Sequence, residues 1–453
     1  MQARAAYQFL ISGHIDEGQA AFREVLARVG LHRPATPNHA LVLLLKERII
    51  LSVRGLGFRS RAAEDVAPGE LACVDTARAV AVGISVVDVV QGSYFQTRSL
   101  RLALRAGEPF RIALALGWEA VHSACRGRSA RRRTARLIAL SASVASRVGH
   151  PHAIGMATLS AGAADYMAGR FPAAVKLLDR AAQLFREECT GVGWELDTSQ
   201  VFGLWARIYQ GEFAELSSRF QALDQEARER GDRYMESTLG TYPGVLARLA
   251  ADQPGEARDL GEGAIAQWSQ HGFHVQHLTH YYGNTYIDLY EGDGGAAWRR
   301  AERSWPEIRA SLLPRIQHVK VDVLQLRGRS AVAAAAQARA PGPLLLAAEE
   351  SARQIDRERM AWGQAVATLI RAGVCSIRGD EARCQRLLVE GLSRAEAEHL
   401  GLFAAAARRR LGSLLGGDAG RAHVARADAW MAGQNIKDPV RMVACLVPGF
   451  PTA

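Results

Sequence analysis

Apolar residues recur along this chain with the spacing of amphipathic helices. Between residues 201 and 209, apolar side chains fall three, four, seven and eight positions apart, which places them on one face of a helix. A second apolar stripe follows between residues 213 and 223. Gly211 lies between the two stripes and allows a tight turn, because glycine has no Cβ. The pattern therefore predicts a helical hairpin over residues 201–223.

This hairpin pattern returns about every forty residues. Clear copies occupy residues 163–185, 204–223 and 286–305, each with an apolar stretch, a turn glycine and an Ala-rich amphipathic stretch. Self-similarity at such a period is typical of solenoids, in which each repeat buries its apolar face against its neighbours. We therefore predict an all-α, right-handed superhelical solenoid of about ten antiparallel helix hairpins. It is tetratricopeptide-like, with a period longer than the usual ~34 residues.

Residues 331–343 interrupt the pattern, because they are Ala-rich and end in Pro-Gly-Pro. We predict a main repeat array over residues 1–330, a flexible joint over 331–343, and C-terminal helical repeats with a tail over 344–453. Met1 opens almost directly into a repeat without a polar capping helix. We therefore expect a chain cut from a longer protein, or a start codon inside an older reading frame.

The composition is that of a large soluble protein with an ample core, since 48% of the 453 residues are hydrophobic. The net charge of +10 would suit an acidic partner. However, only four of the basic residues are lysine, and this arginine skew, with abundant Ala and Gly, indicates a GC-rich bacterial genome instead. Six cysteines without a CxxC pair indicate reduced thiols. With no visible signal peptide or membrane span, we predict a cytoplasmic location and no membrane partner.

Motifs of the common ATP-dependent and hydrolytic enzymes are missing from the sequence. A P-loop needs Lys followed by Ser or Thr, whereas the four lysines precede Glu47, Leu177, Val321 and Asp438. The kinase motifs GxGxxG, HRD and DFG are absent, as are GxSxG and HExxH. We therefore predict no catalytic residue, no cofactor and no metal, and expect that the chain is not an enzyme.

Two clusters carry candidate chemistry. Histidines stand at positions 271, 274, 277 and 280. Steps of three residues turn the first and last of them to opposite faces of a helix, so we expect structural or solvated histidines, with metal binding or a pH-sensitive contact as alternatives. The arginine-rich run 126–136 could meet phosphates or an acidic partner. It has no interleaved aromatic residues for base stacking, and we expect a solvated turn and helix start.

Three short segments mix aromatic, polar and charged residues in the manner of a binding groove. The candidate partner-binding residues are Gln96 and Arg98 in FQTR, Arg111 in GEPFR, and Trp194, Glu195 and Asp197 in CTGVGWELDTSQ. Asp197 or Thr198 could instead cap the helix that follows. In the groove interpretation, Trp194 is the hydrophobic anchor.

Several segments together resemble one known family. They are ISGHIDEGQAAFREVLARVGL (11–31), VRGLGFRSR (53–61), FQTRSLRLALRAGEPFRIALAL (95–116), CTGVGWELDT (189–198), ARERGDRY (227–234), IDLYEGD (287–293) and NIKDPVRMVACLVPGF (435–450). They are similar to the C-terminal tetratricopeptide-like tail of large bacterial serine/threonine protein kinases, in which a kinase domain and a STAND-type ATPase module precede the tail. The resemblance covers the tail alone, so no catalytic residue of that family is carried over. It implies a sensory or scaffolding role, in which the tail receives a signal or partner and restrains the kinase and ATPase modules.

The sequence thus predicts a non-catalytic protein-interaction module, either the regulatory tail of such a kinase or a truncated stand-alone copy. The expected partners are a protein or peptide in the concave groove and a kinase or ATPase module in cis or in trans. The alternative is a free-standing scaffold that recruits partners to a signalling or transcription-regulatory complex. An enzyme built on a helical array lacks paired catalytic motifs. Nucleic-acid binding would need a continuous basic groove.

Overall fold

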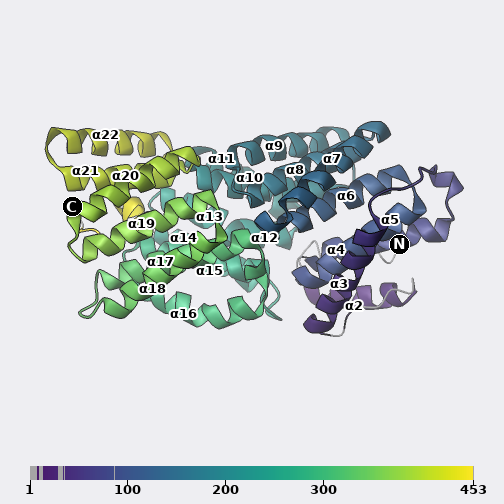
Figure 1. Ribbon diagram of the computed structural model, residues 1–453, viewed down its shortest axis with the longest axis horizontal. Coiled ribbons are helices and arrows are strands. Elements are labelled where there is room, and N and C mark those ends of the chain that lie inside the picture. Colours follow the sequence, from purple (N-terminus) through teal and green to yellow (C-terminus); the bar gives the residue numbers. More distant parts are fainter. Residues whose placement is uncertain (1–7, 10–13, 29–33, 35, 86, 452–453) are drawn as a thin grey trace.

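The computed structural model describes residues 8–9, 14–28, 34, 36–85 and 87–451. Within these ranges the chain folds into helices and short connections, without a β-strand. The prediction of an all-α solenoid of antiparallel hairpins is confirmed (Figure 1). The opening of the first repeat at Met1, on which the expectation of a cut chain depends, lies outside the described residues.

Eight hairpins follow one another from residue 109 to residue 433. Their first helices are α6 (Pro109–Ala124), α8 (Pro151–Met167), α10 (Gly193–Gln210), α12 (Arg233–Thr241) with α13 (Pro243–Ala250), α15 (Val275–Tyr290), α17 (Gln317–Ala335), α19 (Ala361–Ile377) and α21 (Gly401–Leu415). Their second helices are α7 (Arg131–Val148), α9 (Phe171–Glu188), α11 (Phe213–Arg230), α14 (Pro254–Ala266), α16 (Gly294–Ala310), α18 (Gly342–Glu358), α20 (Glu381–Ala397) and α22 (Gly417–Gly433). The first helices begin 40 to 44 residues apart, which agrees with the predicted period.

Further helices flank this array. At the N-terminal side lie α2 (Ile15–Arg28), α3 (Pro37–Arg54), α4 (Pro68–Ser85) and α5 (Val89–Ala106), and at the C-terminal side lies α23 (Pro439–Leu446). Short 3-10 turns η1 (Ala63–Asp65), η2 (Gly127–Ala130) and η3 (Leu313–Arg315) connect some of the helices.

Local sequence explains where these helices begin and end. Pro109 and Pro151 occupy the first helical position, where the missing N–H would have no intrahelical partner. Gly211 ends α10 in the left-handed conformation, with φ of 78°. That conformation suits glycine because it has no Cβ to clash.

The first and second helices of the hairpins differ in burial. Helix α6 is buried on almost every side, whereas α7 buries a single stripe and exposes its arginine-rich remainder. The same contrast holds between α10 and α11. The first helices therefore form the inside of the superhelix and the second helices its outer surface. Polar side chains within the first helices are consequently shielded from bulk water.

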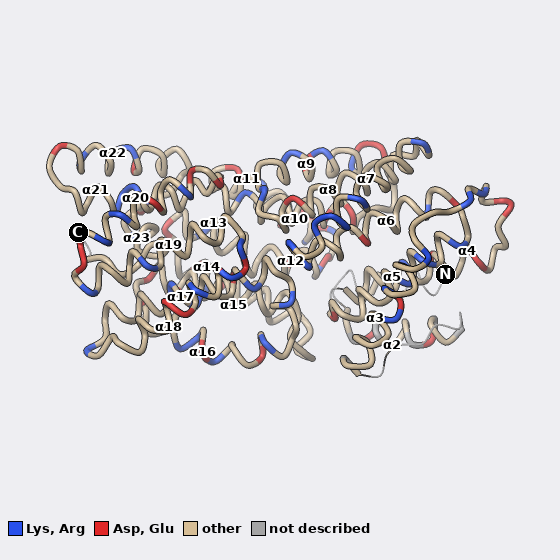
Figure 2. The backbone as a smooth tube through the Cα atoms, viewed as in Figure 1, with Lys and Arg blue, Asp and Glu red and all other residues tan. Residues whose placement is uncertain are grey.

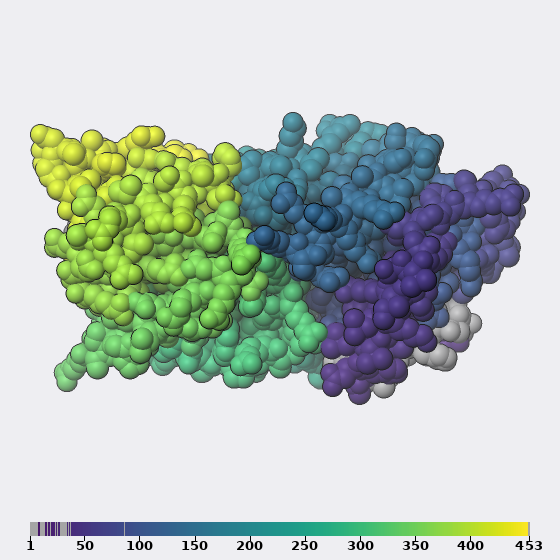
Figure 3. Space-filling model, in the orientation of Figure 1, coloured from purple at the N-terminus to yellow at the C-terminus, as the bar shows by residue number. Residues whose placement is uncertain are grey.

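The superhelix completes a turn and packs against itself. A Cβ added to Gly211 would lie 2.7 Å from the backbone nitrogen of Leu402, and one added to Gly401 would lie 2.4 Å from the carbonyl oxygen of Gln210. Only glycine allows α10 and α21 to approach this closely. Figure 3 shows blue atoms of the first half of the chain meeting green atoms of the C-terminal half on the surface. A further contact between the two halves is the hydrogen bond of 3.1 Å that the backbone N–H of Gln317 donates to the carbonyl oxygen of Cys125.

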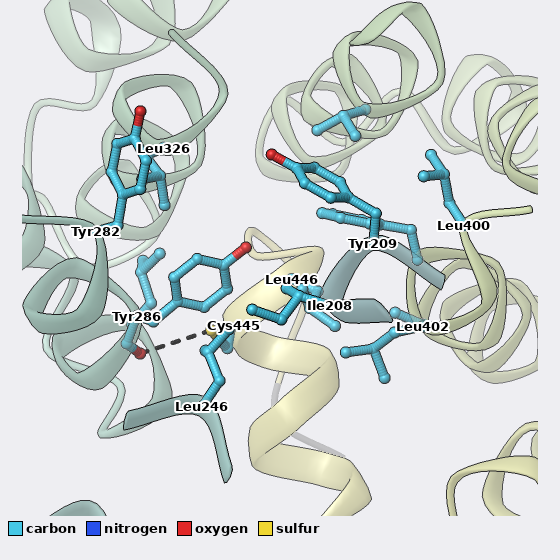
Figure 4. Packing of buried hydrophobic residues seen from close by; sticks show 14 of the residues in the cluster. Ile208, Tyr209, Leu246, Tyr282, Tyr286, Leu326, Leu400, Leu402, Cys445 and Leu446 are labelled. Carbon is cyan, nitrogen blue, oxygen red and sulfur yellow. Dashed lines mark hydrogen bonds between the residues drawn. The ribbon is translucent and has the colours of Figure 1, made fainter. Parts of the chain in front are cut away.

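The last helix, α23, lies inside this closed turn. Figure 4 shows it surrounded by side chains of α10, α13, α15, α17 and α21. The backbone N–H of Lys437 donates to the carbonyl oxygen of Ala250 at 2.8 Å, and Arg441 forms an ion pair with Asp252 at 2.7 Å. Cys445 is fully buried against the carbonyl oxygen of Tyr286. The chain's own C-terminal segment therefore fills part of the concave interior.

The segment predicted as a joint forms an ordinary hairpin connection. Residues 331–335 are the buried end of α17, and 336–341 form the turn into α18. The hydrophobic core continues across this turn, from Val332 to Leu345. The division of the chain into two units at this point stays a prediction.

Charged residues are interspersed over the surface. In Figure 2, basic and acidic segments alternate along outer helices such as α9 and α22. Many of them pair, as in the Arg186–Glu226 and Arg378–Glu349 bridges. Among the described residues, no helix is both long enough and apolar enough to cross a bilayer.

Candidate functional site

A cavity lies among the inner helices; Tyr209 and Tyr282 line it, and no described residue of α23 does. The cavity has a volume of about 200 Å³. The lining residues come from successive repeats and include Val82, Val89, Gln96, Trp118, His122, Tyr166, Trp194, Thr198, Phe202, Trp205, Tyr209, Tyr234, Tyr242, Gln276, Tyr282, His318, Val319 and Asp322. Because α4 and α17 both contribute, the cavity spans the closed turn from one side to the other.

Aromatic rings form most of the wall. Tyr166 lies with its ring centroid 5.3 Å from that of Phe202 and 6.1 Å from that of Trp205. The rings of Trp194 and Tyr234 lie 4.7 Å apart. Such clusters combine a large apolar area with fixed geometry. Phe202, Trp205 and Tyr234 are half-buried, as is Val319 on α17, so the cavity is not sealed from solvent.

One carboxyl group stands in this wall. The hydroxyl of Tyr209 donates to Asp322 Oδ1 at 2.5 Å, and His318 Nε2 lies 3.1 Å from the same hydroxyl. Because that hydroxyl has one proton and gives it to Asp322, we assign the N–H of His318 to Nε2, which then donates to Tyr209. Asp322, His318 and Tyr209 are all buried. The three side chains join α10 to α17 across the turn.

Burial governs the protonation of this group. It raises the pKa of Asp322 to about 7, against the lowering effects of the Tyr209 hydrogen bond and of Arg329. It lowers the pKa of His318 to about 3 and that of His122 to about 4. Both histidines are therefore neutral near pH 7. Asp322 is the one acid on the described cavity lining, and its charge changes in the physiological range.

Several buried polar atoms on this lining have no hydrogen-bond partner within the protein. They are Gln96 Oε1, Trp118 Nε1, Trp194 Nε1, Thr198 Oγ1, Trp205 Nε1, Gln276 Oε1, Tyr282 OH and His318 Nδ1. A buried polar atom without a partner costs about 1–3 kcal/mol, so such groups are uncommon in cores. Their concentration around one cavity is typical of a binding site.

Two of the six predicted partner-binding residues line this cavity. Gln96 on α5 uses its amide nitrogen to bond the carbonyl oxygen of Ala115 at 2.8 Å, which leaves its amide oxygen without a partner. Trp194, in the first turn of α10, packs its ring against Tyr234. Sequence reasoning thus marked one residue at each of two separate parts of the wall.

Glu195 and Asp197 lie outside the cavity lining and hold helices together. Glu195 is buried and pairs with Arg78 and His152, each at 3.4 Å; although burial raises its pKa, these partners outweigh burial and set the pKa below its usual value. Asp197 pairs with Arg230 at 2.9 Å. Burial and the nearby Asp232 raise the pKa of Asp197 to about 7.

The alternative that Asp197 or Thr198 caps a helix is wrong. Helix α10 begins at Gly193, so both residues lie inside it, and its N-cap residue Val192 offers no side-chain bond.

Arg98 and Arg111 also lie outside the cavity lining. Arg98 pairs with Glu47 at 3.6 Å and donates to the Tyr94 hydroxyl at 3.2 Å. Arg111 forms two bonds of 2.8 Å to Asp75. Both guanidinium groups therefore tie neighbouring helices in the N-terminal part. Their assignment to partner binding stays a prediction.

The histidine run does not converge on one point. His271 is exposed before α15, His274 accepts a hydrogen bond from Trp268 Nε1 at 3.0 Å, and His280 lies 3.2 Å from Glu262. The described residues contain no cluster of three or more metal-ligating side chains. In the arginine-rich run, Arg133 bonds the buried Glu119 at 2.7 Å. All six cysteines are free thiols.

Most of the cavity-lining residues are not among the binding residues predicted from the sequence, and the reason is physical. Trp205 and Tyr209 lie on the apolar stripe between residues 201 and 209, which predicts packing residues, and both also pack against other rings. Asp322 did carry a signal, since it is an acid inside the apolar run VKVDVLQL. Buried acids are uncommon unless they are paired or functional.

Searches against protein-family models and against curated proteins found no match to this chain.

Replacing Asp322 with asparagine is expected to stabilise the protein at alkaline pH. The raised pKa means that the folded state holds its proton more tightly than the unfolded chain, whose aspartate pKa is near 3.8. Asp322 therefore destabilises the folded state least below about pH 4, and it lowers the free energy of unfolding progressively as the pH rises to about 7. Asparagine removes this dependence and can still accept from Tyr209.

We expect the Asp322→Asn variant to gain about 1–3 kcal/mol more, relative to wild type, at pH 8 than at pH 5. Urea denaturation of both proteins at the two pH values measures this difference. An equal gap at both pH values would show that the pKa of Asp322 is not raised.

Proposed function

We propose that this chain is a non-catalytic helical-repeat binding module whose inner cavity receives a ligand and whose closure responds to it. The observation that carries the proposal is that the residues of the cavity wall come from repeats distant in the sequence. These residues come from inner helices between α4 and α17, including both sides of the closed turn. An occupant would contact repeats far apart in sequence and would stabilise one superhelical curvature over others.

Such a module suits the regulatory tail of a bacterial serine/threonine kinase with an ATPase module, which is the family that the sequence resembles. In that setting, ligand-dependent curvature would alter how the tail contacts the kinase and ATPase modules in cis or in trans. The outer helices, with their mixed charges, would provide the protein contacts. A cytoplasmic location fits this role.

A peptide partner would have restricted access to the interior. Helix α23 already fills the neighbouring part of the concave face, so a peptide could insert only a few side chains into the remaining cavity. The alternative function, a free-standing scaffold for a signalling or transcription-regulatory complex, would use the same outer surface without a ligand-dependent change.

A cavity-filling variant tests the proposal. Val319 is half-buried at the cavity on α17, and Val319→Trp is expected to fill the opening while leaving the fold intact. Val440→Trp is the matched control, because Val440 is 38% exposed on α23. Thermal melting with a panel of small cationic, neutral and anionic aromatic compounds provides the measurement.

We expect at least one chemical class to raise the melting temperature of the wild type and of Val440→Trp by several degrees, and to leave Val319→Trp unchanged. A panel without effect on the wild type, or with equal effect on all three proteins, would contradict the proposal.

A further inference from the structure

The cavity lining has an unusual distribution of charge. None of its described residues is Lys or Arg, and Asp322 is its one acid. Its two histidines, His122 and His318, are neutral near pH 7, because desolvation lowers the pKa of both and the charge of Arg48 lowers that of His122 further. A ligand inside would therefore meet one negative charge and no positive one on the wall.

The aromatic rings strengthen this preference. The face of an aromatic ring carries partial negative charge and attracts cations, by about 0.5–2 kcal/mol per ring. Tyr166, Tyr209, Tyr242 and Tyr282 all sense the charge of Asp322, because that charge contributes to raising the pKa of each hydroxyl, after burial. All four tyrosines line the cavity together with Asp322, and the Tyr209 hydroxyl bonds the carboxyl group directly.

We propose that the cavity binds a lipophilic organic cation, an ammonium or similar onium group carried on an apolar or aromatic body. Asp322 would supply the counter-charge, the tyrosine rings would surround the cationic group, and Trp205 and Phe202 would cover the apolar body. This inference deepens the proposed function and rests on it, since it names the chemical class of the ligand.

Two arginines act on lining residues from outside the lining, namely Arg48 on His122 and Cys125, and Arg329 on Asp322. The indole N–H groups of Trp118, Trp194 and Trp205 are neutral donors that suit an oxygen acceptor on the same ligand. Arg329 is the charged group that acts on Asp322 from the same helix. It lies outside the lining, with its guanidinium carbon 4.6 Å from the ring centre of Tyr286 and 5.7 Å from that of Phe403.

Cation binding should depend on pH through Asp322. The groups around this carboxyl group are His318 and Arg329 on α17, Tyr209 on α10, Tyr166 on α8, Tyr242 at the start of α13, and Tyr282 and Tyr286 on α15. Burial lowers the pKa of His318 to about 3 and raises those of the tyrosines above their usual value, so neither His318 nor these tyrosines titrate between pH 6 and 8. Asp322, with a pKa of about 7, does. A cation prefers the ionised carboxylate, so its affinity should rise with pH across this range.

Three compounds of one shape and different charge test the inference. They are phenyltrimethylammonium, neutral tert-butylbenzene and anionic phenyltrifluoroborate, titrated into the full chain by calorimetry or by quenching of tryptophan fluorescence. At pH 8 we expect the cation to bind at least tenfold more tightly than the neutral compound, and the anion to bind most weakly. We expect cation affinity to fall roughly tenfold between pH 8 and pH 6, as titration of one group with a pKa of about 7 requires.

Variants assign the effect to one residue. Asp322→Asn should lose at least tenfold in cation affinity, bind the neutral compound as the wild type does, and show no pH dependence. Asp197→Asn is the control, because the pKa of Asp197 is also about 7 while the residue lies outside the lining; it should keep the pH dependence.

The outcomes separate the two proposals. Tighter binding of the neutral or anionic compound would overturn the cation inference and leave the binding function intact. A pH dependence of cation affinity that persists in Asp322→Asn would also overturn the inference. Absence of binding by all three compounds to the wild type would count against both proposals.

Discussion

Replacing Trp362 with alanine is expected to destabilise the protein by about 3–5 kcal/mol, the range for removing a large aromatic side chain from a core. Trp362 is 1% exposed and is the largest of the fully buried side chains. It belongs to α19, yet its ring centre lies 5.0 Å from both Tyr209 and His318. The substitution therefore removes a contact between repeats that are distant in the sequence.

The position of Trp362 implies more than a loss of packing. A Cβ on Gly169 would lie 2.3 Å from its ring, so the turn between α8 and α9 rests directly on it. Without the ring, the early and late repeats lose a shared contact and should unfold less cooperatively. In urea denaturation we expect a lower midpoint and a shallower slope.

Trp298→Ala provides the matched control. Trp298 lies half-buried on the outer helix α16, with the guanidinium carbon of Arg327 4.8 Å from its ring centre. Its loss should cost about 1 kcal/mol and leave the slope unchanged. If both variants lost the same stability with the same slope, Trp362 would have no special part in closing the superhelix.

The hairpins could be predicted from the sequence because their signal is local. The apolar stripes over residues 201–223 and the glycine between them define α10, the turn and α11 without reference to the rest of the chain. The closure of the superhelix could not be predicted in the same way. Gly211 was correctly interpreted as a turn glycine, but its missing Cβ also admits Leu402, some 190 residues later. No pattern in a single sequence pairs positions so far apart.

The candidate site was only partly predictable for the same reason. Trp194 and Gln96 drew attention through their mixed surroundings, and both line the cavity. Glu195 had similar surroundings and instead forms a buried ion pair with Arg78. The difference between a cavity wall and a helix contact depends on which helices meet. That is a property of the whole superhelix.

The same helices close the superhelix, line the cavity and surround the C-terminal helix α23. Tyr209 packs on Trp362, bonds Asp322 and lines the cavity. Tyr282 also lines the cavity, and Figure 4 shows the hydroxyls of both tyrosines pointing away from α23. Both rings therefore lie on the cavity wall, and they belong to helices that also surround α23. Displacement of α23 should therefore loosen one side of the cavity.

Introducing a charge on the buried face of α23 should have the largest effect on the fold. Leu446 is 2% exposed, and Figure 4 shows it packed beside Ile208 and Leu402. Leu446→Asp would lose about 1.5–3 kcal/mol of apolar burial and would place an unpaired carboxylate in an apolar site, which costs several kcal/mol more. The total approaches the net stability of a typical domain. The chain can avoid part of this cost by releasing α23, so we expect the segment after Lys437 to become sensitive to protease.

Val440→Asp on the same helix is the control, since Val440 is 38% exposed and its replacement should cost less than about 1 kcal/mol. Urea denaturation and limited proteolysis followed by mass measurement distinguish the two variants. For Leu446→Asp we expect a loss of about 5 kcal/mol or early cleavage within the C-terminal segment. We also expect weaker binding in the cavity, because α10 and α15, which carry Tyr209 and Tyr282, lose their packing against α23. If Leu446→Asp resisted protease and denaturant as well as Val440→Asp does, α23 would contribute little to the closed turn, and the cavity wall would have to be held by the repeats alone.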